Sequence, residues 1–196
     1  MELKDYPRGQ MLEGANCIEI RNPDLERGKI RFALFDFDGT ISLIRQGWQD
    51  VMIPMMVDIL ADLDTGETRE QLHEIVLEFV TRLTGKQTIY QMMEFAEHVT
   101  KRGGQAKDPL EYKWDYLQLL WERIKARVEG LKEGRYTREE MAVPGALEMV
   151  EYLHERGVTL YLASGTDRPY VLDESESLGM HPYFGENIFG AIDDYK

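Results

Sequence analysis

The stretch FALFDFDGT, residues 32 to 40, has two aspartates one residue apart directly after an apolar run. Residues 30–35, IRFALF, are mostly apolar and aromatic, which predicts a strand buried on both faces. A carboxylate in an apolar setting is costly unless a cation, a donor or protonation compensates it, and two carboxylates also repel each other. We therefore expect a positive charge between Asp36 and Asp38.

The composition indicates an acidic globular protein. Its 196 residues are 43% hydrophobic and 30% charged, which suits one core or a core with a smaller second domain. Lys and Arg total 23 against 36 Asp and Glu, and the net charge of −13 argues against nucleic acid or an anionic membrane as a partner. No apolar run approaches the ~18 to 20 residues of a membrane span, and the N-terminus lacks a signal-peptide pattern, so we expect a cytoplasmic protein. These features leave the oligomeric state open.

The chain begins with a polar segment and continues, after the first strand, into a long helical region. In the lead segment, residues 1–29, the alternating patch CIEI at 17–20 predicts a short strand that pairs with the next one. From residue 47 to about residue 133, apolar residues recur at spacings of three and four, and turn sequences divide this region into helices over roughly 47–63, 67–83, 88–101 and 108–130. Aromatic stripes at helical spacing are expected to lie in the core, among them Trp114, Leu117, Leu120 and Trp121.

Beyond the helical region, helices and strands alternate. A helix that ends at Gly157 precedes VTLYLA at 158–163, a second predicted buried strand that runs into the polar sequence SGTD. A helix over 168–178 and a third strand at 187–192 follow. This order predicts an α/β fold with a parallel sheet and an inserted helical domain.

Polar residues follow the first and second strands where each strand ends. In an open parallel sheet, ligands bind outside the carboxyl ends of the strands, so we expect the two clusters to meet there. Two carboxylates on one side of a strand suit Mg²⁺, a hard ion that takes oxygen ligands and also binds substrate phosphate. An ionised Asp36 can attack phosphorus to form an aspartyl-phosphate, while Asp38 exchanges protons with the leaving group and with water. The hydroxyl and amide groups of Ser164 and Gly165 are expected to bind the phosphoryl oxygens.

The sequence DFDGT after an apolar strand, with LASGT ending a later one, resembles the haloacid dehalogenase-like hydrolase superfamily, whose first signature is DxDGT. The resemblance covers residues 30–44 and 143–196. It implies a Rossmann-like parallel-sheet core over 30–44 and 136–196, with a helical cap at 45–135, as in members similar to phosphoglycolate phosphatase and beta-phosphoglucomutase.

The resemblance also assigns roles to three residues and to a metal. Asp36 matches the family's nucleophile, Asp38 its acid/base and Ser164 its phosphate-binding hydroxyl, and both aspartates would bind Mg²⁺. The dehalogenase and phosphonatase branches lack the second aspartate, so Asp38 favours phosphomonoester hydrolysis or phosphoryl transfer.

Near the C-terminus the sequence departs from the family pattern. The family has a lysine after the third strand and an acidic pair after the fourth, but no lysine lies between Ser164 and Asp193. Lys196 lies at about the right place for that catalytic cation. Asp193 and Asp194 follow the third strand rather than a fourth, so the chain is expected to be truncated before the last strand or strands.

Further side chains near these motifs are candidates for substrate binding or support. Thr40 is expected to support the loop after the nucleophile by hydrogen bonding and to lie, like Gly165, near the substrate. Thr166 and Asp167 are expected to cap the following helix. Arg45 at the cap hinge and Lys86 in the loop LTGKQT are expected to grip a distal group of the substrate, with Arg82 beside Lys86; the alternative for Arg45 is a solvent-exposed side chain.

These observations predict a Mg²⁺-dependent phosphatase that acts on a small phosphorylated metabolite, such as a sugar phosphate. A phosphomutase of the same family shares every residue named and would differ in protecting the aspartyl-phosphate from water. A non-catalytic, truncated binding domain is the alternative from another class, because the last acidic motif is absent from the expected place.

Overall fold

A computed structural model describes residues 9–14, 18–26 and 28–192 of the chain. It divides the chain into two compact units, residues 1–31 and 32–196. In the first unit, β1 (Gln10–Met11) pairs antiparallel with β2 (Glu19–Ile20). The prediction that residues 17–20 pair with the next strand was wrong, because the partner is the preceding strand. A short hairpin closes fewer residues and therefore costs less chain entropy than a more distant pairing.

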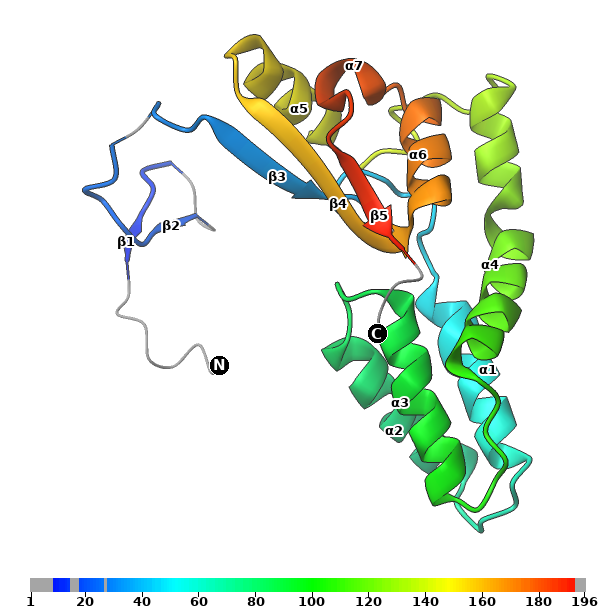
Figure 1. Ribbon diagram of the computed structural model, residues 1–196. Coiled ribbons are helices and arrows are strands. Elements are labelled where there is room, and N and C mark those ends of the chain that lie inside the picture. Colours follow the sequence, from blue (N-terminus) through cyan, green and yellow to red (C-terminus); the bar gives the residue numbers. More distant parts are fainter. Residues whose placement is uncertain (1–8, 15–17, 27, 193–196) are drawn as a thin grey trace. The chain divides into compact units, whose positions relative to one another are not determined.

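The second unit is an α/β fold with a parallel three-stranded sheet in the order β3-β4-β5 (Figure 1). The predicted fold class, with helices inserted after the first strand of the sheet, is confirmed. None of the helices in the described ranges is both long enough and apolar enough to cross a membrane. In chain order the elements are β3 (Phe32–Asp36), α1 (Gln49–Ala61), α2 (Arg69–Arg82), α3 (Thr88–Lys101), α4 (Pro109–Lys132), α5 (Ala146–Glu155), β4 (Thr159–Asp167), α6 (Arg168–Ser177), α7 (His181–Phe184) and β5 (Ile188–Ala191).

Helices α5, α6 and α7 contact β4, and α6 also contacts β5 (Figure 1). The side chains of Leu160 and Leu162 in β4 are fully buried, as alternation along a strand requires when one face is covered. In β3, Phe35 packs edge-on against Phe184 of α7, with ring centroids 6.0 Å apart. One face of each strand therefore belongs to the core.

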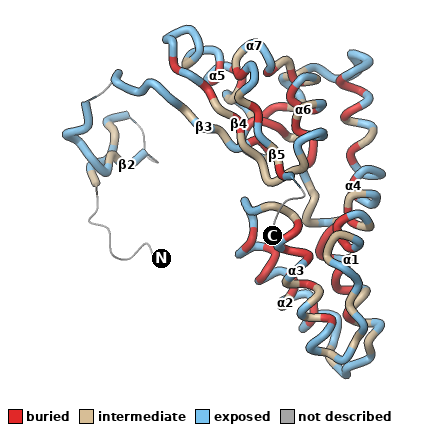
Figure 2. Tube along the Cα trace, viewed as in Figure 1, coloured by how far each residue is buried: buried red, intermediate tan, exposed pale blue. Residues whose placement is uncertain are grey.

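The other face of β3 is open, so the prediction that this strand is buried on both faces was wrong. Phe32 and Leu34 are 62% and 71% exposed, and Figure 2 shows β3 without fully buried residues. Within the described part of the chain, β3 is an edge strand paired with β4 alone, so fewer side chains are available to cover it.

The inserted region consists of α1 to α4, close to the four predicted helical segments. Two of these helices begin with a capping box, formed by Thr68 with Gln71 in α2 and by Asp108 with Glu111 in α4. Their buried side chains form one cluster with those of the sheet region, which includes Phe37, Met52, Phe79, Phe95, Leu120 and Leu162. This continuous packing holds the inserted helices beside the carboxyl ends of the strands.

Candidate active site

The paired carboxylates lie where β3 ends. Asp36 is the last residue of the strand, and the chain then turns tightly, with Gly39 at a φ of +79°, a region that favours glycine. The backbone N–H groups of Ile41 and Ser42 both donate to the carbonyl of Phe37, each at 2.9 Å. The hydroxyl of Thr40 donates to Asp36 Oδ2 at 3.2 Å, which is the supporting hydrogen bond expected for it.

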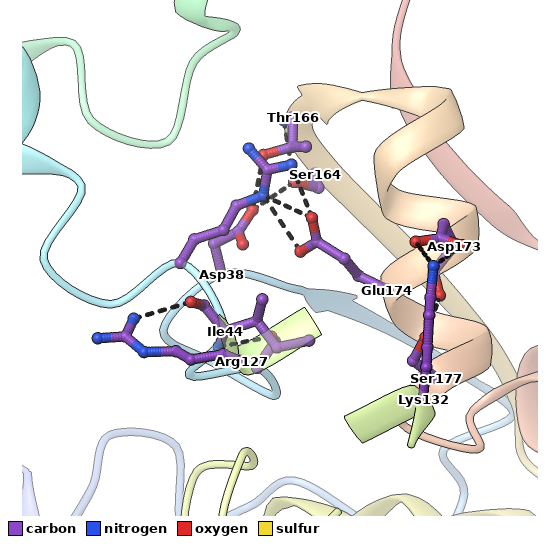
Figure 3. Close-up of polar contacts among 11 residues, drawn as sticks. Asp38, Ile44, Arg127, Lys132, Ser164, Thr166, Asp173, Glu174 and Ser177 are labelled. Carbon is purple, nitrogen blue, oxygen red and sulfur yellow. Dashed lines mark hydrogen bonds and ion pairs between the residues drawn. The ribbon is translucent and has the colours of Figure 1, made fainter. Parts of the chain in front are cut away.

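Strand β4 brings two hydroxyl groups to the second carboxylate. Asp36 is opposite Ala163 in the parallel pairing, so the residues that follow each strand are neighbours. The hydroxyls of Ser164 and Thr166 both donate to Asp38 Oδ2 at 2.9 Å, as Figure 3 shows. The two polar clusters therefore meet at the carboxyl edge of the sheet, as predicted.

Two expectations for this segment were wrong. The second strand does not end at Ala163 but continues to Asp167, with a shift of register against β5 that allows the polar sequence to remain extended. Thr166 does not cap α6, because its hydroxyl binds Asp38. Asp167 occupies the N-cap position without a capping hydrogen bond. The signal that sequence reasoning missed is the alternation of side chains along a strand. Residues 164 and 166 lie two positions apart, so their side chains point to the same side, where both hydroxyls reach Asp38.

The two carboxylates are in unequal environments. Asp38 Oδ1 is buried and has no hydrogen-bond partner among the described residues, although Oδ2 accepts two hydrogen bonds. Burial raises the pKa of Asp36, and the negative charge of Asp38 raises it further. Hydrogen bonds from the Phe37 backbone and from Thr40 oppose this shift. Desolvation and the charge of Asp38 thus disfavour the ionised form of Asp36.

A cavity of about 130 Å³ opens beside these groups, between the strand ends and the inserted helices. Six of the predicted site residues line this cavity, so the fold brings them together: Asp36, Asp38, Arg45, Lys86, Ser164 and Gly165. Thr40 is not in the lining. Lys196, Asp193 and Asp194 lie outside the described residues. The lining comprises a polar group (Asp36, Asp38, Ser164, Gly165, Thr166, Asp167), Arg45 with the apolar and aromatic group Trp48, Met52, Tyr116, Leu117 and Leu120, and a group from the loop and helix α3 (Thr84, Gly85, Lys86, Thr88, Gln91).

Arg45 lies at the cavity wall in a buried ion pair. Its Nη2 is 2.7 Å from Glu174 Oε1, and the two side chains are 7% and 4% exposed. The alternative of a solvent-exposed Arg45 was wrong, because the hinge segment packs against α6. Burial lowers the pKa of Arg45, but the nearby carboxylates of Glu174 and Asp38 outweigh this effect and raise it. Burial also raises the pKa of Tyr116, so its hydroxyl stays protonated beside Arg45 and Asp38.

The loop that contains Lys86 is seated directly on the strand end. A Cβ atom built on Gly165 would lie 2.5 Å from the carbonyl oxygen of Lys86, so only glycine permits this approach of the two backbones. Arg82 is not part of the cavity wall, because its guanidinium group binds Glu78 and Glu94 on the helix surfaces. Of the two cations predicted in this loop region, Lys86 alone lines the cavity.

A second buried ion pair links the inserted helices to the strand end, and sequence reasoning missed it. Lys113 Nζ of α4 is 2.5 Å from Asp167 Oδ1, and the two side chains are 4% and 13% exposed. A lysine is seldom buried without a charged partner, but nothing local to residue 113 indicates that the partner lies 54 residues away.

The carboxylates offer two candidate metal ligands. In the ranges that the structure describes, no group of three or more His, Cys, Asp and Glu side chains is arranged to hold a metal ion. Mg²⁺, however, commonly binds through one or two carboxylates and completes its octahedron with water and substrate phosphate. The unpartnered Asp38 Oδ1 and the solvent-accessible Asp36 fit such a site.

Comparison with known proteins places this geometry in a family. The sequence model for haloacid dehalogenase-like hydrolases matches residues 30–196, which include both strand ends and all the inserted helices. The chain belongs to this family. The predicted resemblance is thereby confirmed, and the matched residues of this haloacid dehalogenase-like hydrolase include Asp36 and Asp38 at the end of β3. No curated protein sequence matches it.

The solved structures that match the chain are distant in sequence. A predicted phosphoglycolate phosphatase from Haemophilus somnus 129pt is 14% identical with a TM-score of 0.51, and the match covers 87% of this chain and 67% of that one. A magnesium-bound HAD-hydrolase from Bacillus subtilis is 17% identical with a TM-score of 0.45, covering 82% and 65% of the two chains. A HAD family hydrolase from Deinococcus radiodurans R1, with bound phosphate and sodium, is 22% identical with a TM-score of 0.38, covering 82% and 58%. The chain thus spans about 58% to 67% of the length of these structures.

Proposed function

We propose that this haloacid dehalogenase-like hydrolase is a Mg²⁺-dependent phosphatase that cleaves a small phosphorylated metabolite through an aspartyl-phosphate. One observation carries the proposal: Asp36 and Asp38 line a single cavity with Ser164 and Thr166, and one oxygen of Asp38 is buried with no hydrogen-bond partner among the residues that the structure describes. Carboxylate pairs of this kind are costly to a fold unless a cation or a reaction uses them.

The residues suggest roles in two steps. In the first, a carboxylate oxygen of Asp36 forms a bond to phosphorus, the bond from phosphorus to the leaving oxygen breaks, and Asp38 gives its proton to that oxygen. In the second, water attacks phosphorus and returns a proton to Asp38, and the bond to Asp36 breaks as inorganic phosphate leaves. The hydroxyls of Ser164 and Thr166 donate to Asp38 Oδ2, so Oδ1 is the oxygen that could bind the cation or carry the proton. The Ser164 hydroxyl can turn from Asp38 to a phosphoryl oxygen when substrate enters.

Asp36 and Asp38 are the residues that would hold Mg²⁺. When bound, the ion would neutralise the paired charges and the phosphoryl oxygens beside them. Its presence would favour the ionised form of Asp36, whose pKa the cavity raises.

The inserted helices are proposed to form a cap over 45–135, with the hydrolase core at 30–44 and 136–196 and a lead segment at 1–29. Support comes from the loop at 84–88, which contributes to the cavity wall and rests on Gly165. A cap in this place would exclude water during phosphoryl transfer and open to release product.

The test is phosphate release from a panel of phosphomonoesters, with Mg²⁺ or EDTA present. We expect release to require Mg²⁺ and to fall by at least about 10³-fold in Asp36→Asn, because the nucleophile is lost. Asp173→Asn is the matched control: it removes one carboxylate from α6, where Asp173 binds Lys132 at the surface. Equal activity of Asp36→Asn and the control would refute the aspartyl-phosphate. Transfer of phosphate between two positions of a substrate, without release, would instead identify a phosphomutase.

A further inference from the structure

A second hollow adjoins the cavity of the paired carboxylates. It has a volume of about 60 Å³ and is lined by Arg45, Leu117, Leu120, Trp121, Ile124 and Tyr170. Three of these residues, Arg45, Leu117 and Leu120, also line the first cavity. The hollow lies between α4 and α6, which are in contact (Figure 1).

One stripe of α4 forms the wall of this hollow. Residues 117, 120, 121 and 124 follow the spacing i, i+3, i+4, i+7 and therefore share one face of the helix. Leu120 and Ile124 are 1% and 2% exposed, but Trp121 is 41% exposed. The prediction that Trp121 is a core residue was wrong, since its ring borders an opening rather than packing in the interior.

An aromatic ring from α6 faces the same hollow. Tyr170 is 39% exposed, and its ring centroid lies 5.3 Å from Cζ of Arg45. Arg45 is the charged member of the lining, and its charge is compensated by the two oxygens of Glu174. Among the described residues, the lining of the hollow therefore combines leucine and isoleucine side chains with two partly exposed aromatic rings, and the charge of Arg45 is compensated by Glu174.

We propose that this hollow receives the leaving group of the substrate, and that the leaving group carries an aromatic ring. The inference rests on the proposed function, because it assumes that the phosphoryl group occupies the end with Asp36 and Asp38. Leu117 and Leu120 line both cavities, and Trp121 and Tyr170 line the second one without lining the first. A flat ring would bury apolar surface against these side chains and stack on the aromatic rings. A polyhydroxylated sugar would lose hydrogen bonds to water, and these side chains would not replace them.

The test compares two non-hydrolysable ligands by isothermal titration calorimetry in the presence of Mg²⁺. Benzylphosphonate and methylphosphonate share the phosphonate group and differ in the ring. We expect benzylphosphonate to bind the full chain about tenfold more tightly, as burial and stacking of one ring imply. In Trp121→Ala this preference should fall to about twofold or less.

The matched control is Trp114→Ala. Trp114 lies on the same helix and lines neither cavity. It is 49% exposed, so the prediction that it is a core residue was also wrong. The control should keep the preference for the ring within about twofold of the unmodified chain, and circular dichroism should show that both variants fold. Equal binding of the two phosphonates, no binding of benzylphosphonate, or the same loss in both variants would overturn the inference.

Phosphate release from phenyl phosphate and from glycerol phosphate separates this inference from the proposed function. A ring preference in binding without release from any ester would overturn the phosphatase and leave the aromatic subsite standing. Release without a preference for the ring, in binding or in kcat/KM, would overturn the subsite alone.

Discussion

At the scale of single residues, the site is defined by an imbalance between Asp36 and Asp38. Asp38 has one oxygen bound by two hydroxyls and another that is buried without a partner in the described ranges. Asp36 accepts a hydrogen bond from the Thr40 hydroxyl, and burial raises its pKa. A cation beside Asp36 would favour its ionised form, which is the form that attacks phosphorus.

This state predicts the acid limb of the pH profile. Because Asp36 must be ionised to attack and its pKa is raised, kcat/KM should fall as the pH decreases through a value above 3.8, the ordinary pKa of the group, at limiting Mg²⁺. Saturating Mg²⁺ should move the limb to lower pH, since the cation favours the carboxylate. Initial rates of phosphate release between pH 3.5 and 8 measure this, and a limb that is unaffected by Mg²⁺ would contradict it.

At the scale of elements, two adjacent acidic residues of α6 have opposite surroundings. Glu174 is buried against Arg45 of the segment between β3 and α1, while the neighbouring Asp173 binds Lys132 of α4 with side chains 49% and 46% exposed (Figure 3). The buried pair joins the start of the inserted region to the helix that follows β4. Its loss would leave an uncompensated charge in the interior, which is the costly outcome for such a pair.

We expect Glu174→Ala to lower the free energy of unfolding by about 3 to 5 kcal/mol, because Arg45 then stays buried without its partner. Asp173→Ala should cost less than about 1 kcal/mol, as solvent screens an exposed pair. Urea denaturation followed by circular dichroism measures both values. The double variant Arg45→Met with Glu174→Leu should recover most of the loss, and a double variant as unstable as Glu174→Ala would show that charge burial is not the cause.

At the scale of the whole molecule, an acidic chain concentrates negative charge at one cavity. The cavity lining in the described residues includes Asp36, Asp38 and Asp167 against Arg45 and Lys86. Arg45 is already paired with Glu174, and Asp167 with Lys113. Of the charged lining residues in the described ranges, this leaves Asp36 and Asp38 against Lys86, an excess of negative charge that a divalent cation would reduce by binding.

Mg²⁺ is therefore expected to raise the melting temperature of the chain. At a concentration about 100-fold above its Kd, the ion should add about 2.7 kcal/mol, or about 5 to 10 °C for a chain of this size. The increase should be reversed by EDTA and should be much smaller in Asp38→Asn, while Asp173→Asn should respond like the unmodified chain. Differential scanning calorimetry measures this shift, and an equal shift in all three proteins would indicate binding elsewhere.

The sequence by itself determined most elements of the second unit and the location of its polar clusters, although the short helix α7 was not predicted. The four inserted helices, the helices at 146–155 and 168–177 and the strands beginning near residues 32, 159 and 188 follow local periodicity and turn residues, so they lie close to their predicted places. The meeting of DFDGT with SGTD follows from the rule that parallel strands end at one edge. These features depend on neighbours along the chain, which the sequence displays directly.

Only the tertiary structure decided which side chains are partners across long separations. Arg45 and Glu174 are 129 residues apart, and Thr166 binds Asp38 across 128 residues, so neither pairing has a local signal. The open face of β3 and the exposure of Trp121 likewise depend on what other segments cover. Periodicity shows that a face is apolar, but burial, hydrogen bonding and cavities arise from the packing of distant segments, which a single sequence does not encode position by position.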